Sequence, residues 1–304
     1  MAQSMEMLHI PPARTKRVVI VGGGFAGLKL ARKLNGKGFQ VVIIDRNNFH
    51  QFQPLFYQVA TAGLEPSAIS YPLRKICQKV PDVHVRMAEL QEVIPAANRI
   101  VTSIGSLDYD YLVIATGAHI HPEETPGLAE HEWGRSIHSF YTLESSSALA
   151  KTMREFKGGR LVVNVVENPI KCPVAPLEFL LLADWHFTRL GIRDRVELVY
   201  ATPLSGAFTK PIASQVLGDL LEKRRIHVEP DFMIERVEPR HIDVMQLQRS
   251  LHALGCRLGD DERLRQLGLV PRPVADPPSD HRLGQTDRAG PNAKGATHAA
   301  ERAG

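Results

Sequence analysis

A glycine-rich turn with an acidic residue downstream is the chemically most informative feature of the chain. Gly22, Gly24 and Gly27 follow the apolar segment 17–21, and Asp45 lies about 20 residues after them. Glycines at this spacing allow a tight turn and let the backbone approach a pyrophosphate, while a carboxylate at that distance accepts hydrogen bonds from ribose hydroxyls. We therefore expect this region to bind a dinucleotide.

Three segments must form a strand, a helix and a second strand if these groups are to meet one ligand. Residues 17–21, RVVIV, form a short run rich in β-branched residues. Residues 25–34 place apolar side chains at helical spacing, and residues 39–44 form a second apolar run that is followed by Asp45. The free N–H groups and the positive dipole end of the helix would then face the phosphates. This context favours a ligand site over a glycine-rich turn that binds nothing.

Up to about residue 240, the rest of the chain also alternates between expected strands and expected helices. Residues 47–70 are expected to be loop, and residues 119–139 an irregular crossover between two domains. A parallel α/β architecture is predicted, with its layers covered by helices. The further helices are expected at 71–79, 142–156, 176–190 and 212–223, and the further strands at 83–90, 99–104, 109–115, 160–166, 196–200 and 226–228.

Composition narrows the class of protein. The net charge is +4 and the sequence pI is about 9.0, a mild basic bias that suits an anionic membrane surface but does not require one. No apolar run approaches the roughly 20 residues that span a bilayer, and the N-terminus lacks a signal-peptide core. The three cysteines, Cys77, Cys172 and Cys256, are spaced neither for a metal site nor for a disulfide framework, which indicates a reducing compartment.

A second motif indicates which dinucleotide is bound. Residues 109–117 read YDYLVIATG, and this apolar strand ending in Ala-Thr-Gly resembles the second fingerprint of two-dinucleotide-binding-domain flavoproteins. The resemblance implies a Rossmann-like FAD-binding domain followed by a second Rossmann-like domain, with FAD as cofactor. The residues expected at the cofactor are Gly22, Gly23, Gly24, Phe25, Ala26, Gly27, Asp45, Arg46, Ala88, Ala115, Thr116 and Gly117.

The first half of the chain carries a more specific resemblance. The loop FHQFQPLFYQVATAGL, residues 49–64, resembles type II NADH dehydrogenases, and the likeness runs from residue 16 to residue 118. Its aromatic residues and Pro54 are expected to wall an apolar slot beside the flavin ring. The alternative is a packed loop whose aromatics fill the core, and His50 by itself is better explained as a structural residue.

The second half resembles another branch of the same superfamily. A type II NADH dehydrogenase would carry a second GxGxxG here, but no glycine lies between Gly159 and Gly191, so close approach of NADH phosphates is sterically unfavourable. The segment with Cys172, Pro173 and Glu178 resembles sulfide:quinone oxidoreductases and flavocytochrome c sulfide dehydrogenases up to about residue 239. NADH stays open as a substrate despite the missing motif.

The resemblance makes Cys172 the candidate redox residue. It precedes an expected helix N-terminus and follows Lys171, and both features favour the thiolate that would attack a sulfur donor or the flavin. The alternative is a buried structural cysteine. Glu178 is the candidate for proton transfer or for orienting the turn, although a carboxylate that only stabilises the helix start explains it equally well.

Composition changes sharply at residue 246. Residues 246–304 contain no Phe, Tyr, Trp or Ile and do not resemble the family, and we expect them to be largely disordered. The amino-acid composition of these residues resembles the translation of a GC-rich gene in the wrong reading frame. The FAD domain is therefore expected to be incomplete at its C-terminus. The domains are then a flexible N-terminus at 1–15, the FAD domain at 16–118, a second dinucleotide-binding-like domain at 119–245 and an atypical tail at 246–304.

Three functional hypotheses follow. The leading one is an FAD-dependent oxidoreductase that passes electrons from a small donor such as sulfide through flavin to a quinone. The second is NADH:quinone oxidoreduction, and the third is a truncated or chimeric fragment without catalysis. The leading hypothesis is compatible with a cytoplasmic protein in peripheral contact with the inner face of the membrane, and with a homo-oligomer. The basic residues are scattered along the sequence, which argues against binding of a nucleic acid.

Overall fold

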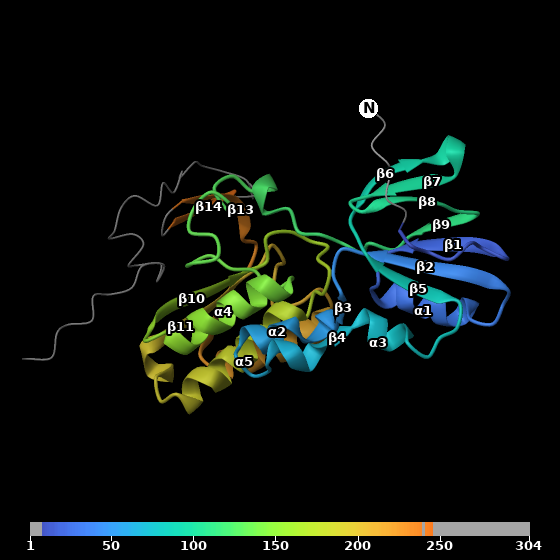
Figure 1. Ribbon diagram of the computed structural model, residues 1–304. Helices are drawn as coiled ribbons and strands as arrows, with labels where there is room; N and C mark the ends of the chain where they lie inside the picture. Colours follow the sequence, from blue (N-terminus) through green and yellow to red (C-terminus); the bar gives the residue numbers. More distant parts are fainter. Residues whose placement is uncertain (1–7, 239–240, 246–304) are drawn as a thin grey trace, which may run out of the picture.

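The computed structural model describes residues 8–238 and 241–245, which form two α/β lobes side by side (Figure 1). This confirms the predicted fold class of two successive Rossmann-like units. The disorder expected for residues 246–304 lies outside the described residues.

The first lobe is built on a parallel four-stranded sheet in the order β5-β2-β1-β9. Its strands are β1 (Lys16–Val21), β2 (Phe39–Asp45), β5 (Val83–Met87) and β9 (Tyr111–Ile114). The register aligns Val21 with Ile44 on one side and with Ile114 on the other, so the three carboxyl ends meet at one edge. The central strands carry the continuous apolar runs 18–21 and 41–44, which are typical of a parallel sheet that is covered on both faces.

Each face of this sheet has its own cover. Helices α1 (Phe25–Leu34) and α3 (Leu73–Cys77) pack on one face with Val18, Ile20 and Val41. The antiparallel strands β6 (Leu90–Ile94), β7 (Arg99–Thr102) and β8 (Gly105–Asp108) lie on the other, where Ile100 and Leu107 contact Val19 and Val42.

Residues 8–11 of the N-terminal segment, which the sequence analysis expects to be flexible, contact the first sheet. Leu8 is 3% exposed and belongs to the core on the β6–β8 side. Arg86 donates from Nε to the Leu8 carbonyl at 2.7 Å, and Gln40 donates to the Pro11 carbonyl at 3.0 Å. One buried leucine and these backbone contacts hold the segment against the sheet, which local sequence does not reveal.

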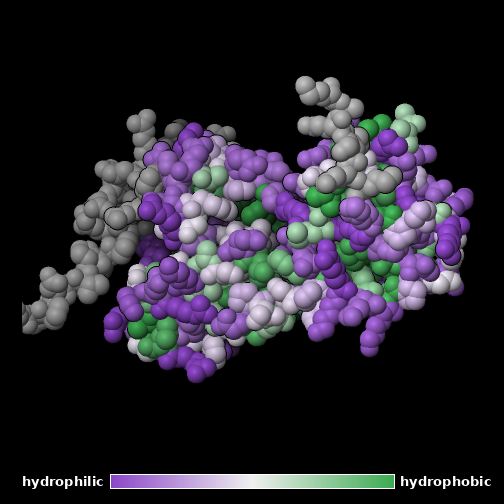
Figure 2. Space-filling model, in the orientation of Figure 1, coloured by the Kyte–Doolittle hydropathy of each residue, from purple (hydrophilic) through white to green (hydrophobic). Residues whose placement is uncertain are grey.

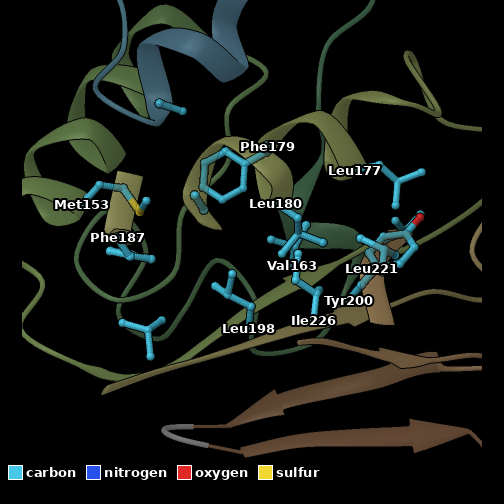
Figure 3. Close-up of a cluster of buried hydrophobic side chains, with 14 of the residues drawn as sticks. Met153, Val163, Leu177, Phe179, Leu180, Phe187, Leu198, Tyr200, Leu221 and Ile226 are labelled. Carbon is cyan, nitrogen blue, oxygen red and sulfur yellow. The ribbon is translucent and has the colours of Figure 1, made fainter. Parts of the chain in front are cut away.

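The second lobe contains the parallel sheet β10-β11-β12, formed by β10 (Gly159–Asn164), β11 (Val196–Ala201) and β12 (Ile226–Glu229). Helices α4 (Leu143–Glu155), α5 (Ala175–Arg189) and α6 (Pro211–Lys223) share one apolar core with it (Figure 3). The hairpin of β13 (Met233–Glu238) and β14 (His241–Met245) follows β12, and Val237 donates its N–H to the Pro126 carbonyl at 2.9 Å.

The expected loop at 47–70 is instead structured and joins the two lobes. It contains the short hairpin β3 (Phe49–Gln51) and β4 (Ser70–Pro72), and helix α2 (Phe56–Ala60). Ala60 and Tyr57 pack in the core of the second lobe, and Val59 packs with Leu143 of α4. Residues 57–60, which precede the domain boundary expected at residue 118, therefore pack with residues of the second lobe. Five-residue helices are too short to show a helical period, which is why the sequence pattern misses α2.

Candidate functional site

The carboxyl edge of the first sheet opens into a long cleft that continues along the second lobe. Of the twelve residues expected at a dinucleotide, all but Gly27 line this cleft. They come from the β1–α1 turn, the end of β2, the segment after β5 and the end of β9. The structure thus brings together positions that are almost 100 residues apart in the sequence.

The β1–α1 turn is shaped for close backbone approach. A Cβ atom added at Gly22 would lie 2.2 Å from the Ala115 carbonyl oxygen, and one added at Gly27 would lie 1.9 Å from the Gly22 oxygen. Gly24, in contrast, faces open space with no atom within 4 Å of such a Cβ. Gly22 and Gly27 are therefore needed for packing, whereas the bare backbone at Gly24 is left for a ligand.

Asp45 closes the turn from the end of β2. Its Oδ2 accepts a hydrogen bond from the Gly23 N–H at 2.6 Å, and its Oδ1 accepts one from the Asn47 N–H at 2.7 Å. A carboxylate has about four acceptor positions, so each oxygen can still accept a ribose hydroxyl. These residues fit the adenosine and pyrophosphate part of FAD: an open glycine backbone at a helix N-terminus and a carboxylate at the next strand end.

A cluster of aromatic side chains flanks the β1–α1 turn. The Phe25 ring lies edge-on to His50 with centroids 4.9 Å apart and edge-on to Phe52 at 5.5 Å, and His50 Nδ1 lies 3.2 Å from the Gly23 carbonyl oxygen. The sequence analysis interprets His50 as a structural residue. In the structure His50 contacts the glycine turn and also lines the cleft. Phe56 is only 3% exposed and turns into the core, so that part of the aromatic loop is packing rather than a slot.

The turn between β10 and α5 differs from the β1–α1 turn. It spans residues 165–174, whereas residues 22–24 suffice between β1 and α1. Pro169 and Pro173 lie in it, and Glu167, Pro169 and Lys171 face the cleft. A long proline-containing turn with side chains in the cleft does not offer the bare backbone that a second pyrophosphate requires.

Cys172 and Glu178 lie next to cleft residues along the chain but do not themselves line the cleft. The Cys172 side chain is half-buried, and its carbonyl accepts the Ala175 N–H at 3.2 Å where α5 begins. Glu178 lies in the first turn of α5 and is also half-buried. Neither residue lines the cleft, whereas Lys171 and Pro176 do.

Tyr141 is a cleft residue that the sequence reading missed. Its hydroxyl lies 3.5 Å from the Cys172 carbonyl, and its ring stacks against Phe140, which in turn stacks on Phe179 of α5. Burial raises the pKa of Tyr141 to about 12, and the nearby Cys172 and Tyr200 add to this increase. No periodic pattern marks this residue, because it lies between the irregular crossover and the start of α4.

Two classes of feature do not occur in the part of the chain that the structure describes. None of its helices combines the length and apolar character needed to cross a bilayer. Its His, Cys, Asp and Glu side chains form no group of three suited to a metal ion.

Comparison with known proteins confirms the resemblance. Residues 16–163 match the family model for pyridine nucleotide-disulphide oxidoreductases. The chain is 26% identical to mouse mitochondrial sulfide:quinone oxidoreductase over 226 residues, which cover 73% of this chain and 50% of that protein. It is 36% identical to the type II NADH:quinone oxidoreductase Ndh of Mycobacterium tuberculosis over 111 residues, which cover 35% of this chain and 24% of that one.

The fold has solved relatives of the same kind. The sulfide:quinone oxidoreductase of Aquifex aeolicus superimposes with a TM-score of 0.67 at 22% identity, over 77% of this chain and 55% of that chain. NDH2 of Plasmodium falciparum gives a TM-score of 0.57 at 15% identity, over 74% and 50% of the two chains. The chain spans about half the length of the sulfide:quinone oxidoreductases that it matches.

Proposed function

Because residues 16–163 match the pyridine nucleotide-disulphide oxidoreductase family, we propose that the chain is an FAD-dependent oxidoreductase that transfers electrons from sulfide to a quinone. The main support for this proposal is the difference between the β1–α1 turn and the β10–α5 turn. The β1–α1 turn suits one dinucleotide, while the β10–α5 turn carries Cys172 where an NADH site would need glycines. Bound FAD would supply a two-electron acceptor, as flavins do in this class of chemistry.

The residues of the first lobe would hold that cofactor. The N–H groups at the start of α1 would face its pyrophosphate beside Gly23 and Gly24, and Asp45 would accept its ribose hydroxyls. Arg46 and Ala88 would flank the adenine end of the cleft. Ala115, Thr116 and Gly117 would line the other side of the β1–α1 turn, at the end of β9.

The residues of the second lobe would handle the donor. Cys172 would contact the donor sulfur, and Glu178, in the first turn of α5, would accept or return a proton. Tyr141 stays protonated in the neutral range, because its pKa is raised, so its O–H can donate to the Cys172 carbonyl.

The proposal also places the protein where a quinone is found. Quinones partition into membranes, so we propose a cytoplasmic protein in peripheral contact with the inner face of the membrane. A homo-oligomer is compatible with this arrangement.

The second candidate is an NADH:quinone oxidoreductase. It is favoured by residues 49–64 and by the identity of 36% to the mycobacterial enzyme over 111 residues. The long β10–α5 turn argues against it, because NADH phosphates would meet side chains and prolines there. A chain that binds no flavin would instead support the third hypothesis, a fragment without catalysis.

Anaerobic titration of the purified protein separates these functions. The visible flavin spectrum is recorded first, and sulfide and NADH are then added separately. We expect sulfide to bleach the flavin, Cys172→Ser to abolish that bleaching while keeping the flavin, and Cys77→Ala, a matched change at a buried thiol of α3, to leave it intact. Bleaching by NADH alone would replace the proposal with the second candidate, and a colourless folded protein would overturn both.

A further inference from the structure

Gly23, in the middle of the β1–α1 turn, is held on three sides. Its N–H donates to Asp45 Oδ2 at 2.6 Å, and its carbonyl oxygen lies 3.2 Å from His50 Nδ1. A Cβ atom added at Gly23 would lie 2.7 and 2.8 Å from the two methyl carbons of the buried Leu73 side chain. Both backbone polar groups of this glycine, and the space beside its α-carbon, are therefore occupied.

Gly24, the next residue, is free where Gly23 is held. No atom lies within 4 Å of a Cβ added at Gly24, and its N–H donates to no acceptor in the part of the chain that the structure describes. The Gly22 N–H, in contrast, donates to the Ile44 carbonyl at 2.8 Å. Gly24 is thus the first residue of the turn whose backbone donor is left for a ligand.

The contact with His50 determines the direction of that donor. The Gly23 carbonyl and the Gly24 N–H belong to one trans peptide group, in which the C=O and N–H bonds point to opposite sides. Because the carbonyl is held toward His50, the Gly24 N–H points away from His50. Rotation of this peptide group would break the contact with His50.

The His50 side chain is itself held in place. Its backbone pairs with Tyr71 in the β3–β4 hairpin, and its ring lies edge-on to Phe25 with centroids 4.9 Å apart. Strand β3 lies where the two lobes meet (Figure 1), and Figure 2 shows hydrophobic side chains between hydrophilic ones at that junction. Apolar surroundings strengthen a hydrogen bond, so the contact between His50 and Gly23 is well placed to fix the peptide.

We propose that His50 is a positioning residue that holds the Gly23–Gly24 peptide group in the orientation that binds a dinucleotide phosphate. The proposal rests on the proposed function for the nature of the ligand, an adenine nucleotide with a pyrophosphate. It also assigns a proton. A carbonyl oxygen can only accept, so His50 Nδ1 carries the hydrogen, and the neutral ring leaves Nε2 unprotonated.

The position of this proton is the first test. Nitrogen NMR of the full chain, labelled at histidine, shows which ring nitrogen carries the hydrogen, and the signal that is missing in His50→Asn belongs to His50. We expect the Nδ1–H form for neutral His50. The Nε2–H form would overturn the proposal, because Nδ1 could then not donate to the Gly23 carbonyl. This test requires neither bound flavin nor turnover.

Nucleotide affinity is the second test, with ADP and adenosine as probes. ADP carries the pyrophosphate, whereas adenosine lacks it. Loss of one hydrogen bond should weaken the binding of ADP to His50→Leu by about five- to tenfold and leave the binding of adenosine unchanged. His50→Asn supplies an amide N–H close to the position of Nδ1 and should recover most of the affinity for ADP.

A matched control replaces a histidine elsewhere in the same lobe. His84, on β5, is also half-buried but does not line the cleft, so His84→Leu should change neither affinity. Equal losses of ADP and adenosine binding in His50→Leu would overturn the proposal, because His50 would then only support the fold. Unchanged binding of ADP to His50→Leu would overturn it as well.

The outcomes also separate this proposal from the proposed function. If the chain binds ADP as expected but sulfide does not reduce its flavin, the proposed function fails and the role of His50 stands. If the unaltered chain binds no ADP, the dinucleotide site itself is wrong and both proposals fail.

Discussion

Asp45 Oδ2 accepts a hydrogen bond from the Gly23 N–H at 2.6 Å, which connects the end of β2 directly to the turn that opens α1. The sequence pattern assigns Asp45 to a ribose. The structure adds a second role, because the same carboxylate fixes the backbone that would face the pyrophosphate.

Replacement of Asp45 should separate these two roles. Asp45→Ala leaves the Gly23 and Asn47 N–H groups without an acceptor, and loss of a hydrogen bond to a charged group costs roughly 1.5–3 kcal/mol. Asp45→Asn keeps one acceptor oxygen. We expect FAD content, measured by absorbance after gel filtration, to fall strongly in Asp45→Ala and less in Asp45→Asn, and equal retention in both would contradict the assignment.

Gly24 and Gly27 give opposite predictions for the same substitution. Alanine at Gly27 would place its Cβ 1.9 Å from the Gly22 oxygen, so Gly27→Ala should destabilise the fold by several kcal/mol. Alanine at Gly24 meets no atom within 4 Å, so Gly24→Ala should keep the thermal midpoint of the apoprotein but bind FAD more weakly. Thermal denaturation and flavin titration measure the two effects, and unchanged FAD affinity in Gly24→Ala would show that the ligand does not approach there.

The hydroxyl of Tyr141 should lose its proton only at high pH in an alkaline titration of the folded protein. Its pKa is raised to about 12 by burial, whereas a tyrosine in the unfolded chain titrates near pH 10. The folded state thus disfavours the tyrosinate, so the stability from this group is complete below about pH 10 and is lost as the pH rises toward 12.

Ultraviolet difference absorbance of tyrosinate measures this step. Tyr141→Phe should remove one tyrosinate near pH 12 and should leave stability less sensitive to pH between 10 and 12. Tyr200 is also buried, with its pKa raised by burial, and remains as an internal reference. Loss of a tyrosinate near pH 10 instead would mean that the Tyr141 hydroxyl is exposed to solvent.

Asp184 should contribute far more to stability than a nearby exposed aspartate. Its side chain is 7% exposed and pairs with Arg193 at 2.6 Å and with Arg224 at 3.0 Å. Asp184→Ala leaves the buried Arg193 guanidinium without its partner, for which we expect a loss of about 3–5 kcal/mol.

Asp194 provides the control for this measurement. It pairs with Arg225 at 2.9 Å but is 84% exposed, so Asp194→Ala should change stability by less than about 1 kcal/mol. Urea denaturation followed by circular dichroism measures both variants. Similar effects of the two substitutions would show that burial does not set the strength of these ion pairs.

The sequence alone determined the elements whose signals are local. The β-branched run at β1, the glycine turn, the apolar stripe of α1 and Asp45 at the end of β2 each follow from a few neighbouring residues, so their spacing was enough to predict a parallel α/β fold and a dinucleotide site. Tertiary structure decided the features that depend on distant contacts. Helix α2 packs against the second lobe, Leu8 packs on the first sheet, and Tyr141 contacts the turn that carries Cys172. These contacts form because packing between remote segments lowers the free energy of the folded chain. Local periodicity in the sequence cannot reveal such contacts.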